Sequence, residues 1–224
     1  MNGLLLIVSL LISFGALLAF ARIFGKNGIF AFVAIATMLA NIEVVIVVQA
    51  FGMTQTLGNI LFASTFLATD ILSECYGKKD ANRAVLIGIL SEVAFAVISR
   101  LWLFYTPENP EIFTSISAVF SQTPRIIAAS LFAFAVSQLL DVRLYHFIWK
   151  KTGESKRFLW LRNNAATLAS QLVNTVLFNF AAFYGVFDIK TLVFVTASGY
   201  VIFIFTSLLD TPFLYLARRM KKAE

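Results

Sequence analysis

Two similar stretches of the sequence, SQLLD and SQLVN, place polar side chains inside long apolar segments. In each stretch a glutamine is followed three residues later by an acid or an amide, which gives the pairs Gln138 with Asp141 and Gln171 with Asn174. Residues three apart lie on one face of a helix, so each pair can act as a single hydrogen-bonding site. Carboxylate and amide groups arranged in this way are suited to binding a small polar molecule.

Further acids occur within the apolar segments. Asp70 and Glu74 are four residues apart and share a helix face, and with the two pairs above they form the predicted substrate-binding set. Asn41, Glu43 and Asp210 are predicted as additional cavity or coupling positions. A carboxylate near the centre of a bilayer costs at least about 2.5–3.5 kcal/mol, so such acids normally face the bundle interior and mark a pathway.

Glu92 stands alone among these acids, and we leave it outside the predicted site. It has two alternative interpretations, an ion pair with Arg100 or a contact in a homo-oligomer. For a single glutamine or asparagine in a membrane helix, the simpler interpretation is an interhelical hydrogen bond, worth about 0.6 kcal/mol on average. The repeated pairs, together with Asp70 and Glu74, instead favour a binding site.

Sequence motifs for catalysis and metal binding are absent from this chain. It contains no Walker motif, no HExxH and no GxSxG. Its one cysteine, Cys75, can form neither an internal disulfide nor a zinc site by itself. The single histidine, His146, is predicted near the end of its helix. We therefore predict that the protein is not an enzyme and uses no cofactor or metal.

The composition identifies the elements that must carry these polar residues. The 224 residues are 59% hydrophobic and 13% charged, which is more apolar than the roughly half expected of a soluble domain. Apolar runs of more than about 18 residues are long enough for a helix to cross a bilayer. We predict an all-α integral membrane protein, a polytopic bundle of about seven transmembrane helices. The predicted spans are residues 3–21, 28–51, 59–75, 84–104, 125–149, 164–187 and 191–217.

The connections between the predicted spans alternate in charge. Every second connection is basic, whereas the others are neutral or acidic and include Glu108 and Glu111. Positive charge marks cytoplasmic connections, so the net charge of +6 indicates orientation rather than nucleic-acid binding, with the N-terminus outside and the C-terminus cytoplasmic. The basic residues of these connections are Arg22, Lys26, Lys78, Lys79, Arg83, Lys150, Lys151, Lys156, Arg157, Arg162, Arg218, Arg219, Lys221 and Lys222. A signal peptide over residues 1–21 is the alternative, but that stretch has no basic residue before its apolar run.

The depth of the two glutamine pairs is also predictable. Counting inward from Pro124 and Asn164 at about 1.5 Å per residue puts Gln138 and Gln171 near the middle of a roughly 30 Å hydrocarbon core. Their two helices run in opposite directions, as inverted halves do around a central transporter site. We expect these helices to be neighbours, with both glutamines facing one cavity rather than lipid.

Four stretches together resemble a known family. TDILSECYGKKDANRAV, SQLLDVRLYHFIWKKTG, LWLRNN and SQLVNT are similar to the queuosine precursor transporter family, also called the vitamin uptake transporter family, and the resemblance runs from about Asn41 to Pro212. It implies a multi-pass protein of the cytoplasmic (inner) membrane with six or seven spans. It also implies a secondary transporter that imports 7-deazaguanine bases for salvage into transfer RNA modification, with a purine-like small molecule as substrate and no nucleic acid bound directly.

The resemblance implies a division of the chain and has one departure. Residues 1–27 would be an extra N-terminal helix and loop, 28–217 the transporter core and 218–224 a basic cytoplasmic tail, all in one transmembrane domain covering 1–224. The second SQ element of the family often ends in Asp, whereas this chain has Asn174. An amide carries no titrating charge but still hydrogen-bonds a purine-like edge.

Two other functions remain as alternatives. A substrate-binding subunit of an energy-coupling-factor importer is also a small, basic membrane protein, and it would copurify with an ATPase module. A membrane enzyme or scaffold would need a nucleophile, base or metal arrangement that the sequence does not contain.

Overall fold

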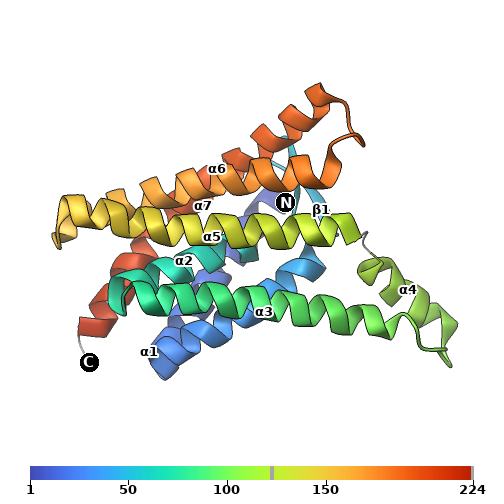
Figure 1. The fold of residues 1–224 in the computed structure, drawn as a ribbon, viewed down its shortest axis with the longest axis horizontal. Coiled ribbons are helices and arrows are strands. Elements are labelled where there is room, and N and C mark those ends of the chain that lie inside the picture. Colours follow the sequence, from blue (N-terminus) through green and yellow to red (C-terminus); the bar gives the residue numbers. More distant parts are fainter. Residues whose placement is uncertain (122–123, 223–224) are drawn as a thin grey trace.

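The computed structural model describes residues 1–121 and 124–222, and within these ranges it contains seven α-helices, one short 3-10 helix and one β-hairpin (Figure 1). Five helices in the described ranges, α1, α3, α5, α6 and α7, are long and apolar enough to cross a membrane. The prediction of an all-α membrane protein is therefore confirmed. The elements are α1 (Asn2–Glu43), β1 (Val47–Ala50), β2 (Met53–Thr56), α2 (Gly58–Cys75), α3 (Lys78–Trp102), α4 (Pro110–Phe120), α5 (Pro124–Thr152), the 3-10 helix η1 (Lys156–Phe158), α6 (Leu159–Phe183) and α7 (Ile189–Lys222).

The first two predicted spans form the two arms of α1. The helix is broken at Gly25, where φ is 59° and ψ is −141°, a conformation that residues with a side chain rarely adopt. The arms meet closely beyond the break, because a Cβ atom added to Gly28 would lie 2.0 Å from the backbone oxygen of Phe20. Both glycines therefore permit the chain to fold back on itself.

The second predicted span, residues 28–51, extends beyond the end of the helix that the structure contains. The helix stops at Glu43, and Val47–Ala50 instead pairs antiparallel with Met53–Thr56. The run VVIVV is rich in β-branched residues, which favour strands. Phe51 and Gly52 both have positive φ, at 54° and 75°, as the two-residue turn of a tight hairpin requires.

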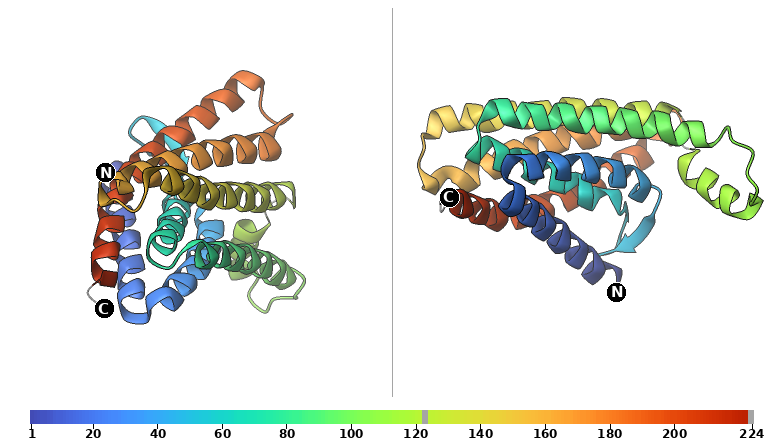
Figure 2. Two further views of the ribbon diagram at one scale, coloured as in Figure 1. Left: turned by 60° about the vertical axis from the view of Figure 1, so that its left-hand side comes forward. Right: turned by 90° about the horizontal axis from the view of Figure 1, so that it is seen from below.

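Helix α2 lies at the centre of the bundle. It contacts α1, α3, α5 and α7, and Figure 2 shows it enclosed by these helices. Every residue from 63 to 73 is buried, so its polar side chains cannot reach water. A helix buried on all sides must find hydrogen-bond partners for such groups inside the protein. The short third span predicted at 59–75 therefore becomes the inner wall of the candidate site.

Helices α5 and α6 are antiparallel neighbours, as predicted (Figure 1). Helix α5 begins at Pro124 as expected, but α6 begins at Leu159, five residues before the predicted start at 164. Arg162 was predicted in a basic connection, and the structure places it inside α6 instead. The stretch before α5 forms the 11-residue helix α4, which is capped by the Asn109 side chain.

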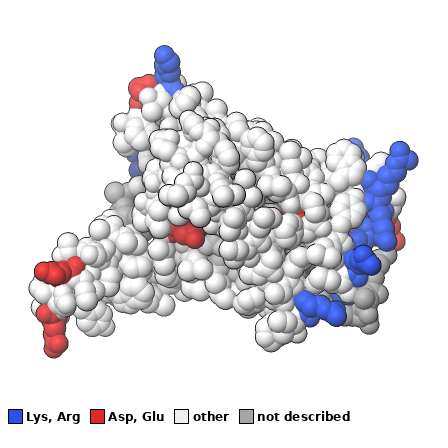
Figure 3. All heavy atoms as spheres, turned by 180° about the vertical axis from the view of Figure 1, so that it is seen from behind, with Lys and Arg blue, Asp and Glu red and all other residues white. Residues whose placement is uncertain are grey.

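Charged residues separate to the two ends of the molecule. Lys and Arg gather at the end formed by the α2–α3 and α5–α6 connections and the end of α7, whereas Glu108 and Glu111 lie near α4 at the opposite end (Figure 3). The surface between them in this view is mostly uncharged. Exposed apolar side chains on the long helices include Leu90, Val97 and Phe205. This arrangement suits a hydrocarbon layer around the middle. The predicted basic tail, 218–224, continues α7 as far as Lys222, and its last two residues lie outside the described range.

Candidate functional site

The polar side chains inside the bundle follow the same order along two parallel helices. On α2 the order is Thr65, Asp70 and Glu74, and on α5 it is Gln138, Asp141 and Tyr145. Toward the α4 end, Phe62 of α2 and Ser130 of α5 line one pocket. Each residue on α2 contacts its counterpart on α5 or lines one pocket with it, and we call each such pair a level. Since an α-helix rises about 1.5 Å per residue, the levels are roughly one or two turns apart. The site is therefore a polar path along the bundle from the α4 end to the basic end.

The two SQ stretches bind each other reciprocally. The Ser170 hydroxyl donates to Asp141 Oδ1 at 2.8 Å, and the Ser137 hydroxyl donates to Asn174 Oδ1 at 3.4 Å. The serine that opens each stretch thus meets the residue that closes the other. The antiparallel packing of α5 on α6 explains why one pattern occurs twice, and why both stretches lie at one depth.

The glutamines of the two stretches point inward, as predicted. Gln138 is 0% exposed and Gln171 is 1% exposed. Gln138 Nε2 donates to Thr65 Oγ1 at 2.7 Å, and its Oε1 accepts from Thr69 Oγ1 at 3.1 Å, so this side chain joins α5 to α2. Gln171 Oε1 is buried and has no hydrogen-bond donor among the described residues. Of the two, Gln171 retains an acceptor for a ligand.

Three buried carboxyl groups meet at the next level. Asp70, Asp141 and Asp210 are 0%, 0% and 2% exposed. Thr167 Oγ1 donates to Asp70 at 3.0 Å, and Asn163 Nδ2 donates to Asp210 at 2.7 Å. Asp70 and Asp141 lie within hydrogen-bonding reach of each other, and Asp210 interacts electrostatically with both.

The donors found for these carboxyl groups do not satisfy every oxygen. Asp70 Oδ1 and Asp141 Oδ2 are buried without a donor from the described residues. The donors that are present are neutral hydroxyls and one amide. Carboxylate oxygens of this kind accept hydrogen bonds from N–H groups.

Asp210, predicted as an additional cavity or coupling position, stands two residues before Pro212, and a proline often ends or kinks a helix. Helix α7 instead continues through Pro212 to Lys222, which leaves Asp210 in the interior against Asn163 of α6. The same early start of α6 that moved Arg162 into the helix also supplies this partner.

Glu74 lies one level nearer the basic end, in a buried ion-pair cluster. Its carboxylate accepts from Arg162 Nη2 at 2.6 and 2.7 Å and from the Tyr145 hydroxyl at 2.7 Å. Arg218 Nη1 lies 2.9 Å from its second oxygen. The Arg162 side chain is 0% exposed and packs over the Trp149 ring at 4.5 Å. Glu74 is therefore occupied by partners from α5, α6 and α7, and this cluster closes the basic end of the path.

The α4 end of the path is a narrow pocket with aromatic walls. One part is lined by Asn41, Glu92 and Ser130 together with Phe62 and Phe178, and its lining also includes Thr65. Since Thr65 accepts a hydrogen bond from Gln138, the pocket floor is continuous with the next level. A contact in an oligomer would require Glu92 to lie on the outer surface. Glu92 is only 3% exposed, so it does not lie there.

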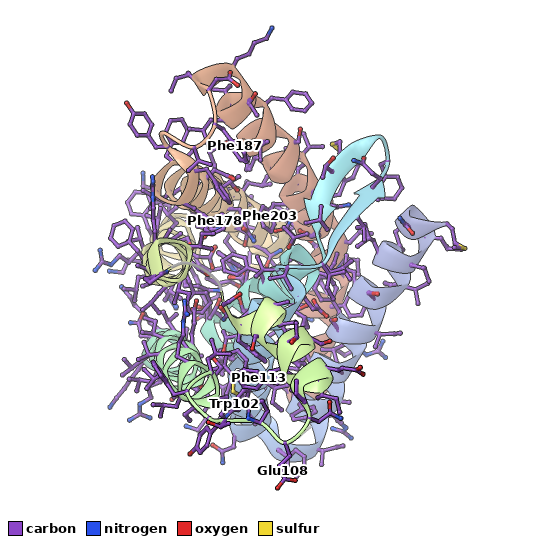
Figure 4. All side chains as sticks on the ribbon, turned by 90° about the vertical axis from the view of Figure 1, so that its right-hand side faces the viewer. Trp102, Glu108, Phe113, Phe178, Phe187 and Phe203 are labelled. Atoms are coloured by element: carbon purple, nitrogen blue, oxygen red, sulfur yellow. The ribbon has the colours of Figure 1, made fainter. Side chains whose placement is uncertain are left out.

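A second part of this pocket extends toward α7. It is lined by Asn174 and shares Phe62, Ser130 and Phe178 with the first part. Phe178 and Phe203, both in its lining, lie side by side when the molecule is viewed from the α4 end (Figure 4). Asn41 lines the first part of the pocket, while Glu43 ends α1 and is partly exposed.

The sequence did not predict the surroundings of two buried charged residues, Glu92 and Arg162. The sequence suggested an Arg100 partner for Glu92, whereas the partners found are Ser130, at 3.1 Å, and Asn41. Arg162 was counted only as a loop charge. The signal for Glu92 was its position in an apolar run, and the signal for Arg162 was its place in LWLRNN. Among the described residues, no cluster of three His, Cys, Asp or Glu is arranged to hold a metal ion.

Comparisons with known proteins place the chain in a family. A protein of Bacillus subtilis (strain 168) named "Probable queuosine precursor transporter" is 37% identical over 211 residues, which cover 94% of this chain and 92% of that protein. The "Queuosine precursor transporter" of Escherichia coli (strain K12) is 29% identical over 146 residues, covering 65% of this chain and 62% of its own. No solved structure matches. The family model described as "Putative vitamin uptake transporter" matches residues 56–217, and the chain, a multi-pass membrane protein, belongs to this family.

Proposed function

We propose that this protein is a secondary transporter that imports queuosine precursors, the 7-deazaguanine bases, across the cytoplasmic membrane for salvage into transfer RNA modification. The observation that carries the proposal is the 37% identity, over 94% of the chain, to a protein named as a probable transporter of these precursors. The polar path through the bundle supports it, because an apolar protein keeps buried carboxylates and amides where a polar molecule must pass.

The proposed central site consists of Asp70, Gln138, Asp141, Gln171 and Asn174. A 7-deazaguanine base presents an adjacent ring N–H and exocyclic amine, which a carboxylate accepts together. Asp70 Oδ1, Asp141 Oδ2 and Gln171 Oε1 are buried acceptors without donors from the described residues. These are the positions where donors from the base fit.

Glu74, also predicted to bind substrate, has a different proposed role. Its oxygens are held by Arg162, Tyr145 and Arg218, so it has little capacity left for a ligand. The pocket lies at the α4 end of the path, and the ion-pair cluster closes the opposite end. We propose that release into the cytoplasm requires this cluster to separate, as expected for alternating access.

The proposed topology has seven spans, with the α4 end outside and the basic end in the cytoplasm. Single-cysteine variants in a Cys75→Ser background test it with a membrane-impermeant thiol reagent on intact cells. A cysteine at Glu108 is expected to react at once, whereas one added after residue 224 is expected to react only after the membrane is opened. Reversed labelling at both positions would overturn the orientation, and with it the assignment of the pocket to the outside.

The function is tested by restoring queuosine in transfer RNA. A bacterial strain that lacks queuosine synthesis and its own importer is supplied with one 7-deazaguanine base at a time, with and without this protein. We expect queuosine to appear only when the protein is present, and only with a base that it carries. If no base restores queuosine although the protein is found in the membrane, the proposed function is wrong.

A further inference from the structure

The pocket at the α4 end contains a buried carboxylate that the predicted site did not include. Glu92 of α3 is 3% exposed and lies in the lining of this pocket with Asn41 of α1 and Ser130 of α5. Three different helices therefore bring polar groups to one enclosed position. A buried carboxylate in a membrane protein is expensive and usually functional.

The carboxylate of Glu92 can accept further hydrogen bonds in addition to those from its present partners. The Ser130 hydroxyl donates to Oε1 at 3.1 Å, and the Asn41 side chain also hydrogen-bonds the carboxyl group. Both partners are neutral. A carboxylate has about four acceptor positions on its two oxygens, so two neutral donors do not exhaust it. Glu92 differs in this respect from Glu74, which faces the cations of Arg162 and Arg218.

The walls of the pocket include several aromatic rings. Phe62, Phe134 and Phe178 line the part that contains Glu92, and Phe203 lines the adjoining part. Figure 4 labels Phe178 and Phe203. Aromatic rings pack face to face or edge to face against other planar ring systems. The combination of aromatic walls with one carboxylate and one amide selects a planar heterocycle that has N–H donors on one edge.

We propose that this pocket is an outer recognition site in which Glu92 accepts the two adjacent N–H groups of a guanine-type edge. The inference rests on the proposed function and adds a residue that determines specificity. Eleven residues, or about 16 Å of helix, separate Ser130 from Asp141 along α5, so the outer site is distinct from the central carboxyl groups. In an adenine-type edge, the ring nitrogen beside the amine carries no hydrogen and is an acceptor. This nitrogen would face a carboxylate oxygen, and two acceptors cannot form a hydrogen bond with each other.

The test compares binding of 7-deazaguanine and 7-deazaadenine to the purified full-length protein in detergent by isothermal titration calorimetry. For Glu92→Gln we expect affinity for 7-deazaguanine to fall by roughly thirty- to a hundredfold, the effect of losing a charge-assisted hydrogen-bond pair. We also expect the preference over 7-deazaadenine to narrow, which a merely structural role would not produce. Glu111→Gln is the matched control, because Glu111 lies exposed on α4, and it should bind like the unmodified protein.

The outcomes separate this inference from the proposed function. If the unmodified protein binds no 7-deazaguanine, the outer site is overturned, whereas the proposed function is decided separately by the restoration of queuosine in transfer RNA. If it binds and folded Glu92→Gln binds equally well with the same preference, only the outer site is overturned. Should Glu92→Gln fail to fold, Ser130→Leu provides the decision, because it places an apolar side chain in both parts of the pocket. We expect Ser130→Leu to remove binding, and full binding by this variant would contradict the proposal.

Discussion

Asp141→Asn is expected to abolish uptake at limiting substrate concentration while the protein still inserts and purifies normally. Asp141 is fully buried beside Asp70, and its Oδ2 has no donor among the described residues. Asparagine preserves the size of the side chain but replaces a charged acceptor with a neutral amide. Losing one charge-assisted hydrogen bond of about 1.5–3 kcal/mol weakens binding by roughly ten- to a hundredfold. Uptake of labelled base by cells at low concentration measures this loss.

Two matched variants give this prediction its controls. Asp210→Asn should be milder, because Asp210 already accepts a hydrogen bond from Asn163 at 2.7 Å and an amide oxygen can retain it. Asp188→Asn makes the same chemical change at an exposed position beyond α6 and should leave uptake unchanged. Uptake by Asp141→Asn equal to that of the unmodified protein would show that the central site is wrongly assigned.

Glu74→Ala is expected to destabilise the folded protein by about 3–5 kcal/mol, the usual effect of removing one member of a buried ion pair. The Arg162 side chain is 0% exposed, so without Glu74 its charge remains in the interior, where its contacts include the neutral Tyr145 hydroxyl, the Trp149 ring and the backbone oxygens of Gly153 and Ser155. Arg218 loses its partner as well. Thermal unfolding of the purified protein in detergent measures the effect as a large fall in Tm.

The double variant Glu74→Leu with Arg162→Met distinguishes two causes of the fall in Tm, an unpaired buried charge and the loss of side-chain packing. Replacing both members of a buried pair by apolar residues is often neutral for stability, so we expect most of the lost Tm to return. We also expect transport to stay impaired, since the variant lacks the ion pair that closes the basic end. A single Glu74→Ala variant as stable as the unmodified protein would exclude a locking role for this cluster.

Local patterns in the sequence predicted the elements and much of the site. The three-residue spacing of Gln138 and Asp141 was sufficient to place both inside the bundle, and the same spacing predicted that α5 and α6 meet at one depth. These successes depend on the helical repeat, which is a local property. The assignment of Asp141 to substrate binding stays a prediction, and for Glu74 we propose the closing role instead.

The remaining features depend on partners that are distant in the sequence. Arg162 looked like a loop charge until α2 supplied Glu74, 88 residues away. Glu92 looked isolated because its partner Ser130 lies 38 residues further along the chain. The hairpin after Glu43 was missed because an apolar run of β-branched residues reads equally as the end of a membrane helix or as a strand.

Uptake by the purified protein in liposomes tests the central claim most directly. The protein is reconstituted without any other component, and the entry of radiolabelled 7-deazaguanine base is followed over time. The account predicts saturable uptake that unlabelled base competes away, and that is absent from empty liposomes and from liposomes with Asp141→Asn. The account would be contradicted if correctly inserted protein took up no more base than empty liposomes. It would also be contradicted if uptake occurred only after an ATPase module was added.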